Sequence, residues 1–226
     1  MASTDDSSLS RRERERYERR QAMLRAAEAV FAEKGYTHAT LEEIAERAEF
    51  GKGTLYNYFE GGKEEIFFAV LDTIYDEICD LIAHSMAAEA DASLRDCYHD
   101  LVLRALAFYQ EREDLFVILI KEAYRMCFSH DAEKVAYFQR QRARMVDALL
   151  PRLEQAAAQG ALRDLPLPAI AHLLIENIDG LIVHRAIADT HPDRPNSCEH
   201  QAMLDDPKQA ATFLTTMLFD GVAASD

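Results

Sequence analysis

The segment Gly51-Lys-Gly-Thr-Leu-Tyr-Asn-Tyr-Phe59 concentrates polar side-chain ends within the length of a short helix. Leu55 and Phe59 are four residues apart, so they share one face of a helix and can pack inward. The tyrosine hydroxyls and the Asn57 amide then lie on the other faces. Such groups suit hydrogen bonds to phosphates and base edges when a helix enters the major groove of DNA.

The flanks of this segment support the same chemistry. Lys52 and Lys63 bracket it, placed to reach phosphates on either side. Gly53 would let the backbone approach a ligand closely. An alternative stays open for Tyr56 and Tyr58, since either ring could instead pack against the preceding helices.

Two predicted helices position this segment. The first begins near Tyr17 and ends at Gly35, a typical C′ residue, with apolar residues at helical spacing. Thr40-Leu-Glu-Glu43 is a capping box that starts a second, short helix, which runs to about Ala48. A three-residue break follows, and Gly61 and Gly62 end the third helix. Two short helices joined by a tight break form a helix-turn-helix outline.

The rest of the chain predicts further helices, and we expect an all-α protein of about nine helices. A long helix begins at Lys63. The run from Leu115 to Ile120 is short enough for a strand, but its charged flanks favour a buried helix. Two last helices are expected near residues 167–188 and 207–222, with broad apolar faces that suit pairing with a second copy of the chain.

Composition excludes several classes of protein. The 226 residues contain no apolar run of the roughly 20 residues that a membrane span needs. Four scattered cysteines and a polar N-terminus predict a cytoplasmic protein. The net charge is −15, yet residues 11–63 hold 11 Lys/Arg against 10 Asp/Glu, so the acidic excess lies mostly elsewhere. Residues 11–20, with six arginines and three glutamates, predict a solvated helix start, or alternatively an arm that touches DNA.

Residues from about Arg19 to Leu71 resemble the DNA-binding region of the TetR family of transcriptional regulators (AcrR-like). The resemblance runs through three stretches and a final short one, namely Ala27-Glu-Ala-Val-Phe-Ala-Glu-Lys-Gly-Tyr36, Thr40-Leu-Glu-Glu-Ile-Ala45, Lys52-Gly-Thr-Leu-Tyr-Asn-Tyr-Phe59 and Lys63-Glu-Glu-Ile-Phe67. It implies a tail over residues 1–16, a helix-turn-helix domain over 17–63 and a ligand-binding and dimerisation domain over 64–226.

The resemblance also implies roles for single residues. Thr40 and Tyr58 would touch phosphates, and Lys63 would hold the phosphate that follows. The groove or its rim would be faced by Lys52, Gly53, Thr54, Tyr56 and Asn57. An amide at Asn57 could favour adenine.

The turn departs from the family pattern of glycine, a small apolar residue and serine. This chain has Glu49, Phe50 and Gly51 there. We expect Glu49 to occupy a left-handed conformation, and the hydroxyl that would cap the next helix is missing. The turn after Phe59 is one residue longer than usual.

Other chemistry has less support in the sequence. His172, Glu176 and Asp179 could share a helix face, where a polar stripe is favoured over a metal site. Asp96 with His99, and the loop residues His191, Cys198 and His200, are weaker metal candidates. We therefore predict no metal, no cofactor and no enzymatic activity. Aromatic and apolar residues of the central helices could line a cavity for an apolar ligand: Ile74, Ile78, Tyr98, Phe116, Tyr124, Tyr137 and Met145.

The resemblance implies a repressor that binds a palindromic operator in double-stranded DNA as a homodimer, and the apolar faces of the two C-terminal helices suit pairing through them. A small, largely apolar effector would release it. The alternative is a helical small-molecule-binding or catalytic protein that no longer reads DNA, which the acidic excess and the altered turn favour.

Overall fold

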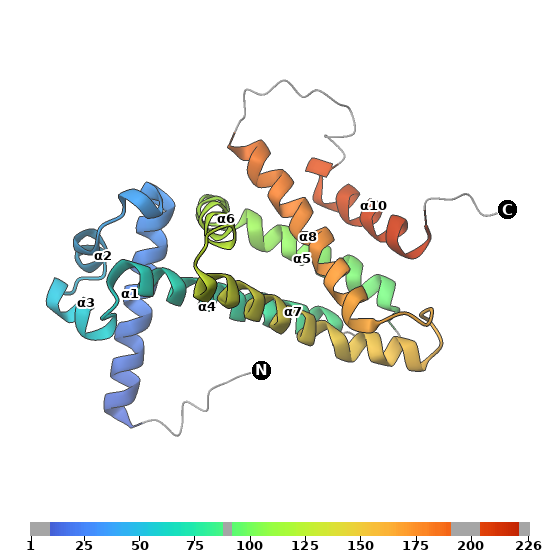
Figure 1. Cartoon of the computed structure of the whole chain (residues 1–226), viewed down its shortest axis with the longest axis horizontal. Helices are drawn as coiled ribbons and strands as arrows, with labels where there is room; N and C mark the ends of the chain where they lie inside the picture. Colours follow the sequence, from blue (N-terminus) through green and yellow to red (C-terminus); the bar gives the residue numbers. More distant parts are fainter. Residues whose placement is uncertain (1–9, 88–91, 191–203, 222–226) are drawn as a thin grey trace. The chain divides into compact units, whose positions relative to one another are not determined.

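The computed structural model describes residues 10–87, 92–190 and 204–221. Over these residues the regular structure is helical throughout, as predicted. The helices form two compact units (Figure 1). One comprises the chain up to Asp76 together with residues 114–122, and the other comprises residues 77–113 together with the chain from Ala123 onward. We call them the N-terminal and the C-terminal unit.

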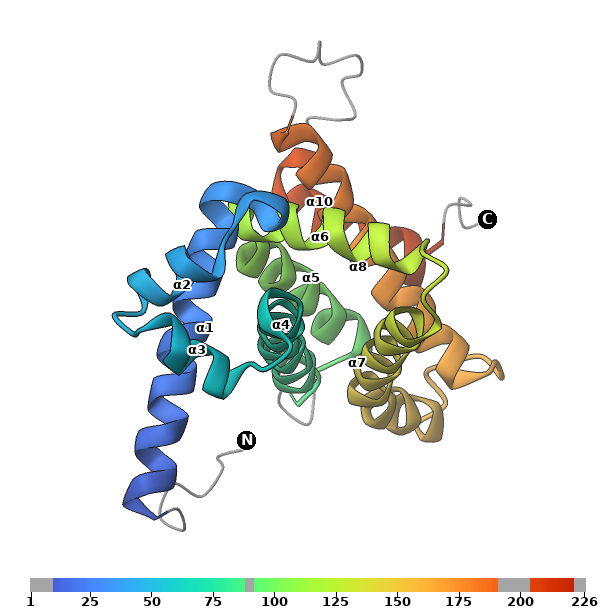
Figure 2. The same ribbon diagram turned by 60° about the vertical axis from the view of Figure 1, so that its left-hand side comes forward.

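The N-terminal unit is built on α1 (Arg11–His38), α2 (Leu41–Arg47) and α3 (Lys52–Tyr58). Figure 2 shows α2 and α3 beside α1. The unit also holds the first part of α4 (Gly62–Met86) and the middle of α6 (Glu113–Cys127). It extends beyond residue 63, where we expected this domain to end, because Phe67 of α4 contacts the rings of Phe31 and Tyr36, with centroids 5.8 and 4.7 Å away.

Helix α1 begins at Arg11, earlier than the predicted start near Tyr17 and inside the predicted tail. The reason is a capping box. The Ser10 hydroxyl accepts from the Glu13 N–H at 3.3 Å, and the Glu13 carboxylate accepts from the Ser10 N–H at 2.8 Å. These two bonds lower the pKa of Glu13. The motif Ser-Arg-Arg-Glu is visible in the sequence, so local reasoning could have found this start.

Helix α1 is interrupted at Gly35, as predicted. Gly35 has φ of 74°, which ends regular helical geometry, and the Ala39 N–H donates back to its carbonyl at 3.1 Å. Helix α2 then starts at the predicted capping box of Thr40 and Glu43. Both boundaries follow from short-range hydrogen bonds that the sequence specifies.

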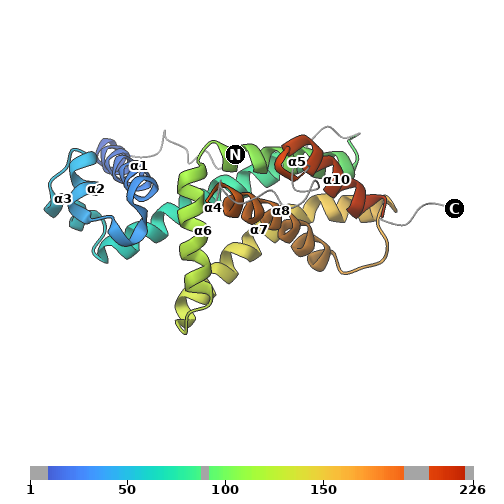
Figure 3. The same cartoon turned by 90° about the horizontal axis from the view of Figure 1, so that it is seen from above.

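The C-terminal unit contains α5 (Leu94–Gln110), α7 (Ala132–Ala158), α8 (Leu167–Asp189) and α10 (Pro207–Phe219). Helix α5 contacts α7, α8 and α10, and α7 also contacts α8 (Figure 3). The predicted helix at 115–120 is part of α6. Helix α10 ends at Phe219, before the predicted residue 222. Among the described helices, α8 alone is long and apolar enough, by length and composition, to cross a membrane.

Candidate nucleic-acid interface

Helix α3 presents one polar face and buries the opposite one. Leu55 and Phe59 are each 1% exposed, as predicted for its inward side. At about 100° per residue, Gly53 and Asn57 lie roughly 160° and 200° around the helix from Leu55, and both are exposed. The Gly53 backbone and the Asn57 amide therefore point directly away from the core.

One flank of this face carries Lys52 and Tyr56. The Lys52 ammonium pairs with Glu42 of α2, and this hydrogen bond raises the pKa of Lys52. The Lys52 ammonium also lies 5.9 Å from the centre of the Tyr56 ring, and Tyr56 is 41% exposed. The Tyr56 side chain thus stays largely available at the surface, beside a cation whose partner is itself exposed.

The other flank carries Thr54 and Tyr58, which are both half-buried. The Arg16 guanidinium of α1 lies over the Tyr58 ring, 5.4 Å from its centre. Packing against the first helix, which we kept as an alternative for this tyrosine, therefore accounts for part of its surface. The geometry brings a cation of α1 beside the end of α3.

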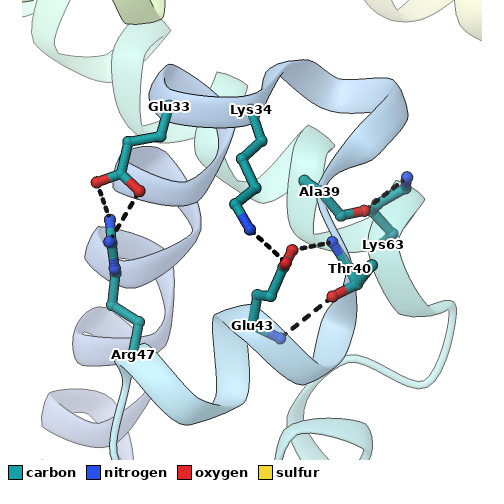
Figure 4. A network of polar contacts seen from close by, with 7 residues as sticks. All are labelled: Glu33, Lys34, Ala39, Thr40, Glu43, Arg47 and Lys63. Atoms are coloured by element: carbon teal, nitrogen blue, oxygen red, sulfur yellow. Dashed lines mark hydrogen bonds and ion pairs between the residues drawn. The ribbon is translucent and has the colours of Figure 1, made fainter.

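A polar network holds α2 against the end of α1 (Figure 4). Arg47 donates two hydrogen bonds to the Glu33 carboxylate, at 2.6 and 2.8 Å. Glu43 accepts from Lys34 as well as from the Thr40 N–H. The Thr40 hydroxyl oxygen accepts a hydrogen bond from the Glu43 N–H at 3.3 Å. This bond does not use the hydroxyl proton, which Thr40 can donate to a phosphate.

Lys63 has a role that the sequence did not indicate. Its ammonium donates to the carbonyl oxygens of Tyr36, Thr37 and Ala39, at 2.8, 3.1 and 2.9 Å. It also lies 4.8 Å from the centre of the Tyr36 ring. A lysine has three N–H donors, so all three are used within the protein. Lys63 joins α4 to the end of α1, and we no longer assign it a phosphate.

The departures in the turn have the expected consequences. Glu49 has φ of 59°, the one positive value of a non-glycine residue in the described part of the chain. Gly51 is the N-cap of α3 and offers no side-chain hydrogen bond to the helix. The turn therefore holds a conformation that costs roughly 1–3 kcal/mol for a residue with a side chain.

A surface hollow adjoins α3, and its lining was not predicted. It has a volume of about 490 Å³ and lies between the start of α1 and the end of α3. The lining residues are Arg12, Glu13, Glu15, Arg16, Arg19, Asn57 and Tyr58. Arg12, Arg16 and Arg19 are thus beside a predicted DNA-contacting residue, Asn57, which no local sequence pattern could have indicated.

The predicted ligand-pocket residues have varied environments. Tyr98 has no exposed surface, and its hydroxyl donates to the Leu174 carbonyl at 2.9 Å, so it belongs to the core. Burial raises the pKa of its phenol. Tyr124 is 51% exposed and stacks on Phe128. Ile74, Phe116 and Met145 are buried, whereas Ile78 and Tyr137 are half-buried. Their common pocket stays a prediction.

The His172, Glu176 and Asp179 group forms ion pairs with a residue of another helix. Arg142 of α7 lies 3.2 Å from Glu176 and 2.6 Å from Asp179 of α8. His172 is exposed, 3.6 Å from Glu176. No group of three potential metal ligands occurs among the residues that the structure describes. The candidates His191, Cys198 and His200 lie outside those residues.

Comparisons with known proteins find similarity in sequence and in fold. Residues 23–70 match the family described as "Bacterial regulatory proteins, tetR family". The HTH-type transcriptional repressor AcnR of Corynebacterium diphtheriae is 27% identical over 165 residues, which are 73% of this chain and 79% of AcnR. The HTH-type transcriptional activator FasR of Mycolicibacterium smegmatis is 33% identical over 118 residues, 51% of this chain and 48% of FasR.

A solved structure extends the likeness in fold to most of the chain. The transcriptional regulator FadR from Bacillus subtilis, in complex with stearoyl-CoA, has a similar fold, with a TM-score of 0.70. The similarity covers 90% of this chain and 99% of FadR, at 16% sequence identity. At that identity the likeness concerns the fold alone.

Proposed function

The chain belongs to the tetR family of bacterial regulatory proteins, and we propose that it is a transcriptional repressor that binds a palindromic operator as a homodimer. The observation that carries this proposal is the outward face of α3. Gly53 and Asn57 are exposed directly opposite the buried Leu55 and Phe59. A helix held in this way can place an amide against base edges while neighbouring hydroxyls and Lys52 meet phosphates.

The exposure of each residue on and around α3 decides its proposed DNA contact. Asn57 reads a base and Gly53 brings the backbone close to the groove. Phosphates and the groove rim are met by Thr40, Lys52, Thr54, Tyr56 and Tyr58. The sign of regulation is proposed as repression, as in AcnR, whereas FasR is named an activator. A promoter fusion in cells with and without the chain distinguishes repression from activation.

The dimer is proposed to form through α8 and α10. Large apolar side chains stand exposed on both helices, including Leu173 at 60% and Phe213 at 47%. Exposed apolar patches on a folded protein mark interaction sites. Leu174 and Leu214 of the same two helices are buried within the chain and are not part of this patch. Four helices from two copies would cover the patch and set two copies of α3 about one DNA turn, ~34 Å, apart.

A small, largely apolar effector is proposed to release the operator. FadR was crystallised with stearoyl-CoA, which makes that molecule a suitable first probe. Release requires the effector to bind the free form more tightly than the DNA-bound form, by about 1–3 kcal/mol for typical allostery. By linkage, operator DNA must weaken effector binding by the same factor. Titration with and without operator tests this reciprocity directly.

The DNA test uses fluorescence anisotropy with duplexes from the region upstream of the chain's own gene. Wild-type protein should bind one footprint there more tightly than a random duplex of equal length. Asn57→Ala should lose about 1–3 kcal/mol at one operator position, the usual value of a bidentate base contact. Glu154→Ala, at an exposed position of α7 in the C-terminal unit, serves as the control substitution.

The alternative function is a helical protein that binds or converts a small molecule without reading DNA. The net charge of −15 favours it, because a negative field repels DNA at long range. Absence of any salt-sensitive binding to the upstream duplexes would select this alternative. The proposed repressor requires such binding.

A further inference from the structure

The start of α1 projects beyond the part of the helix that packs into the N-terminal unit. The first buried residue of α1 is Met23, and residues 11–19 are all exposed. Twelve residues precede Met23 in the helix, which is a length of roughly 18 Å. In Figures 1 and 2 these turns extend past α3. This extension contributes little to the core, although a capping box at Ser10 and Glu13 keeps it helical.

Three arginines of the extension share one face. Arg12, Arg16 and Arg19 are spaced by four and three residues, so they continue toward the N-terminus the stripe that is buried at Met23 and Ala27. All three line the hollow beside Asn57 and Tyr58 of α3. The arginine row, as we call these three residues, is therefore aligned on the side of α1 that faces the end of α3.

The acidic residues of the hollow are already engaged. Glu13 accepts from Ser10 in the capping box, and Glu15 pairs with Arg11 at 2.9 Å. Within the described part of the chain, no carboxylate lies within ion-pair distance of the arginine row. Three arginines against two glutamates, one of which pairs with Arg11, give the lining of the hollow a net positive charge.

Keeping like charges together on one helix face is unfavourable. Arg12 and Arg16 are four residues apart, a spacing at which like charges destabilise a helix. The Tyr58 ring under Arg16 offsets this only in part. A bound polyanion would offset the repulsion between these arginines. The planar guanidinium group of arginine can donate two parallel hydrogen bonds to phosphate oxygens.

We propose that the arginine row binds phosphates of the DNA that flanks the base pairs contacted by α3, a proposal that rests on operator binding by α3. The arginine row adjoins Asn57, so a DNA duplex bound to α3 would continue toward the arginine row. From Arg12 to Arg19 the row spans roughly 10 Å along the helix. That length corresponds to about three phosphates of one strand, at about 3.4 Å of axis per phosphate. Each protomer would thus gain up to three phosphate contacts outside the bases it reads.

The test compares two variants with equal changes in charge. The first replaces the row, as Arg12→Gln, Arg16→Gln and Arg19→Gln together. The control replaces three other α1 arginines, as Arg11→Gln, Arg14→Gln and Arg25→Gln together. Binding is measured from 50 to 200 mM salt on two duplexes. One is the operator trimmed to the base pairs contacted by α3, and the other carries about eight further base pairs on each side.

On the longer duplex, the row variant should lower the slope of log K against log salt by about 2.7 per protomer, or 0.9 for each lost phosphate contact. Its affinity should fall at least tenfold there and stay unchanged on the trimmed duplex. The control should match wild type more closely on both. Arg12→Lys, Arg16→Lys and Arg19→Lys together should keep most of the slope, because the charges remain. Circular dichroism establishes that each variant is folded.

Equal slopes for the row variant and the control on the longer duplex would overturn the proposal, and so would an equal loss on both duplexes. Binding of wild type to the trimmed operator in the same experiment shows that the proposed function stands even then. Failure of wild type to bind either duplex would instead overturn the proposed function, and the row would have to serve another polyanion.

Discussion

Replacing Lys63 by methionine tests whether this residue is structural or binds DNA. The substitution keeps most of the length of the side chain but removes three charged hydrogen bonds to the carbonyls of Tyr36, Thr37 and Ala39. A hydrogen bond to a charged group contributes about 1.5–3 kcal/mol. The bond to Thr37 is exposed, and water can replace it, whereas the bonds to Tyr36 and Ala39 are partly buried.

Two partly buried bonds at the lower end of this range amount to about 3 kcal/mol. For a chain of this size, each kcal/mol lowers the melting temperature by roughly 2–4 °C. Lys63→Met should therefore melt about 6–12 °C below wild type if the N-terminal unit melts with the rest. Its salt slope for DNA binding should stay at the wild-type value, because no phosphate contact is lost.

Lys52→Met is the matched control. Its ion pair with Glu42 is exposed on both sides, so the free energy of unfolding should stay close to the wild-type value. If Lys52 meets a phosphate, the slope of log K against log salt falls by about 0.9 per protomer. Thermal unfolding followed by circular dichroism and salt-dependent anisotropy measure the two effects. A Lys63→Met protein with wild-type stability and a reduced slope would refute the structural role.

Three further changes test other parts of the molecule. Glu49→Gly should raise the free energy of unfolding by about 0.5–1 kcal/mol in urea denaturation, since glycine adopts φ of 59° without the side-chain strain but loses more entropy on folding; a less stable variant would contradict this. Leu173→Glu combined with Phe213→Glu should give a monomer in sedimentation at micromolar concentration, and a persisting dimer would place the interface elsewhere. Arg47 holds the pKa of Glu33 below its ordinary value, so the stability from this pair is present above the unfolded pKa and is lost as pH falls through the folded one. Glu33→Gln should accordingly flatten the decline in melting temperature below about pH 4.5, and an unchanged decline would show that the pair has no such effect.

Local sequence patterns were sufficient for most of the N-terminal unit. The capping box of Thr40 and Glu43 involves residues three apart, and Gly35 acts on the residues next to it, so both can be recognised without a fold. The left-handed conformation of Glu49 was expected from the resemblance, because the family usually has a glycine at this place in the turn. The same kind of signal is present at Ser10 and Glu13, and this capping box is why α1 starts earlier than expected.

Tertiary structure decided what those residues contact. Lys63 is 24 to 27 residues from the carbonyls that it binds, and its partners exist only because α1 ends beside the start of α4. Arg142 likewise meets Glu176 and Asp179 across two helices. Such partners depend on how elements pack, and residue type and spacing along one helix do not contain that information.

The arginine row depends both on a local sequence pattern and on tertiary packing. Its spacing along α1 and its charge are visible in the sequence, but that pattern favoured a solvated helix start over an arm that touches DNA. The sequence determined a positive stripe at helical spacing. Only the packing of α1 beside α3 placed the stripe next to Asn57 and Tyr58, because a helix encodes which side chains share a face but not what that face meets.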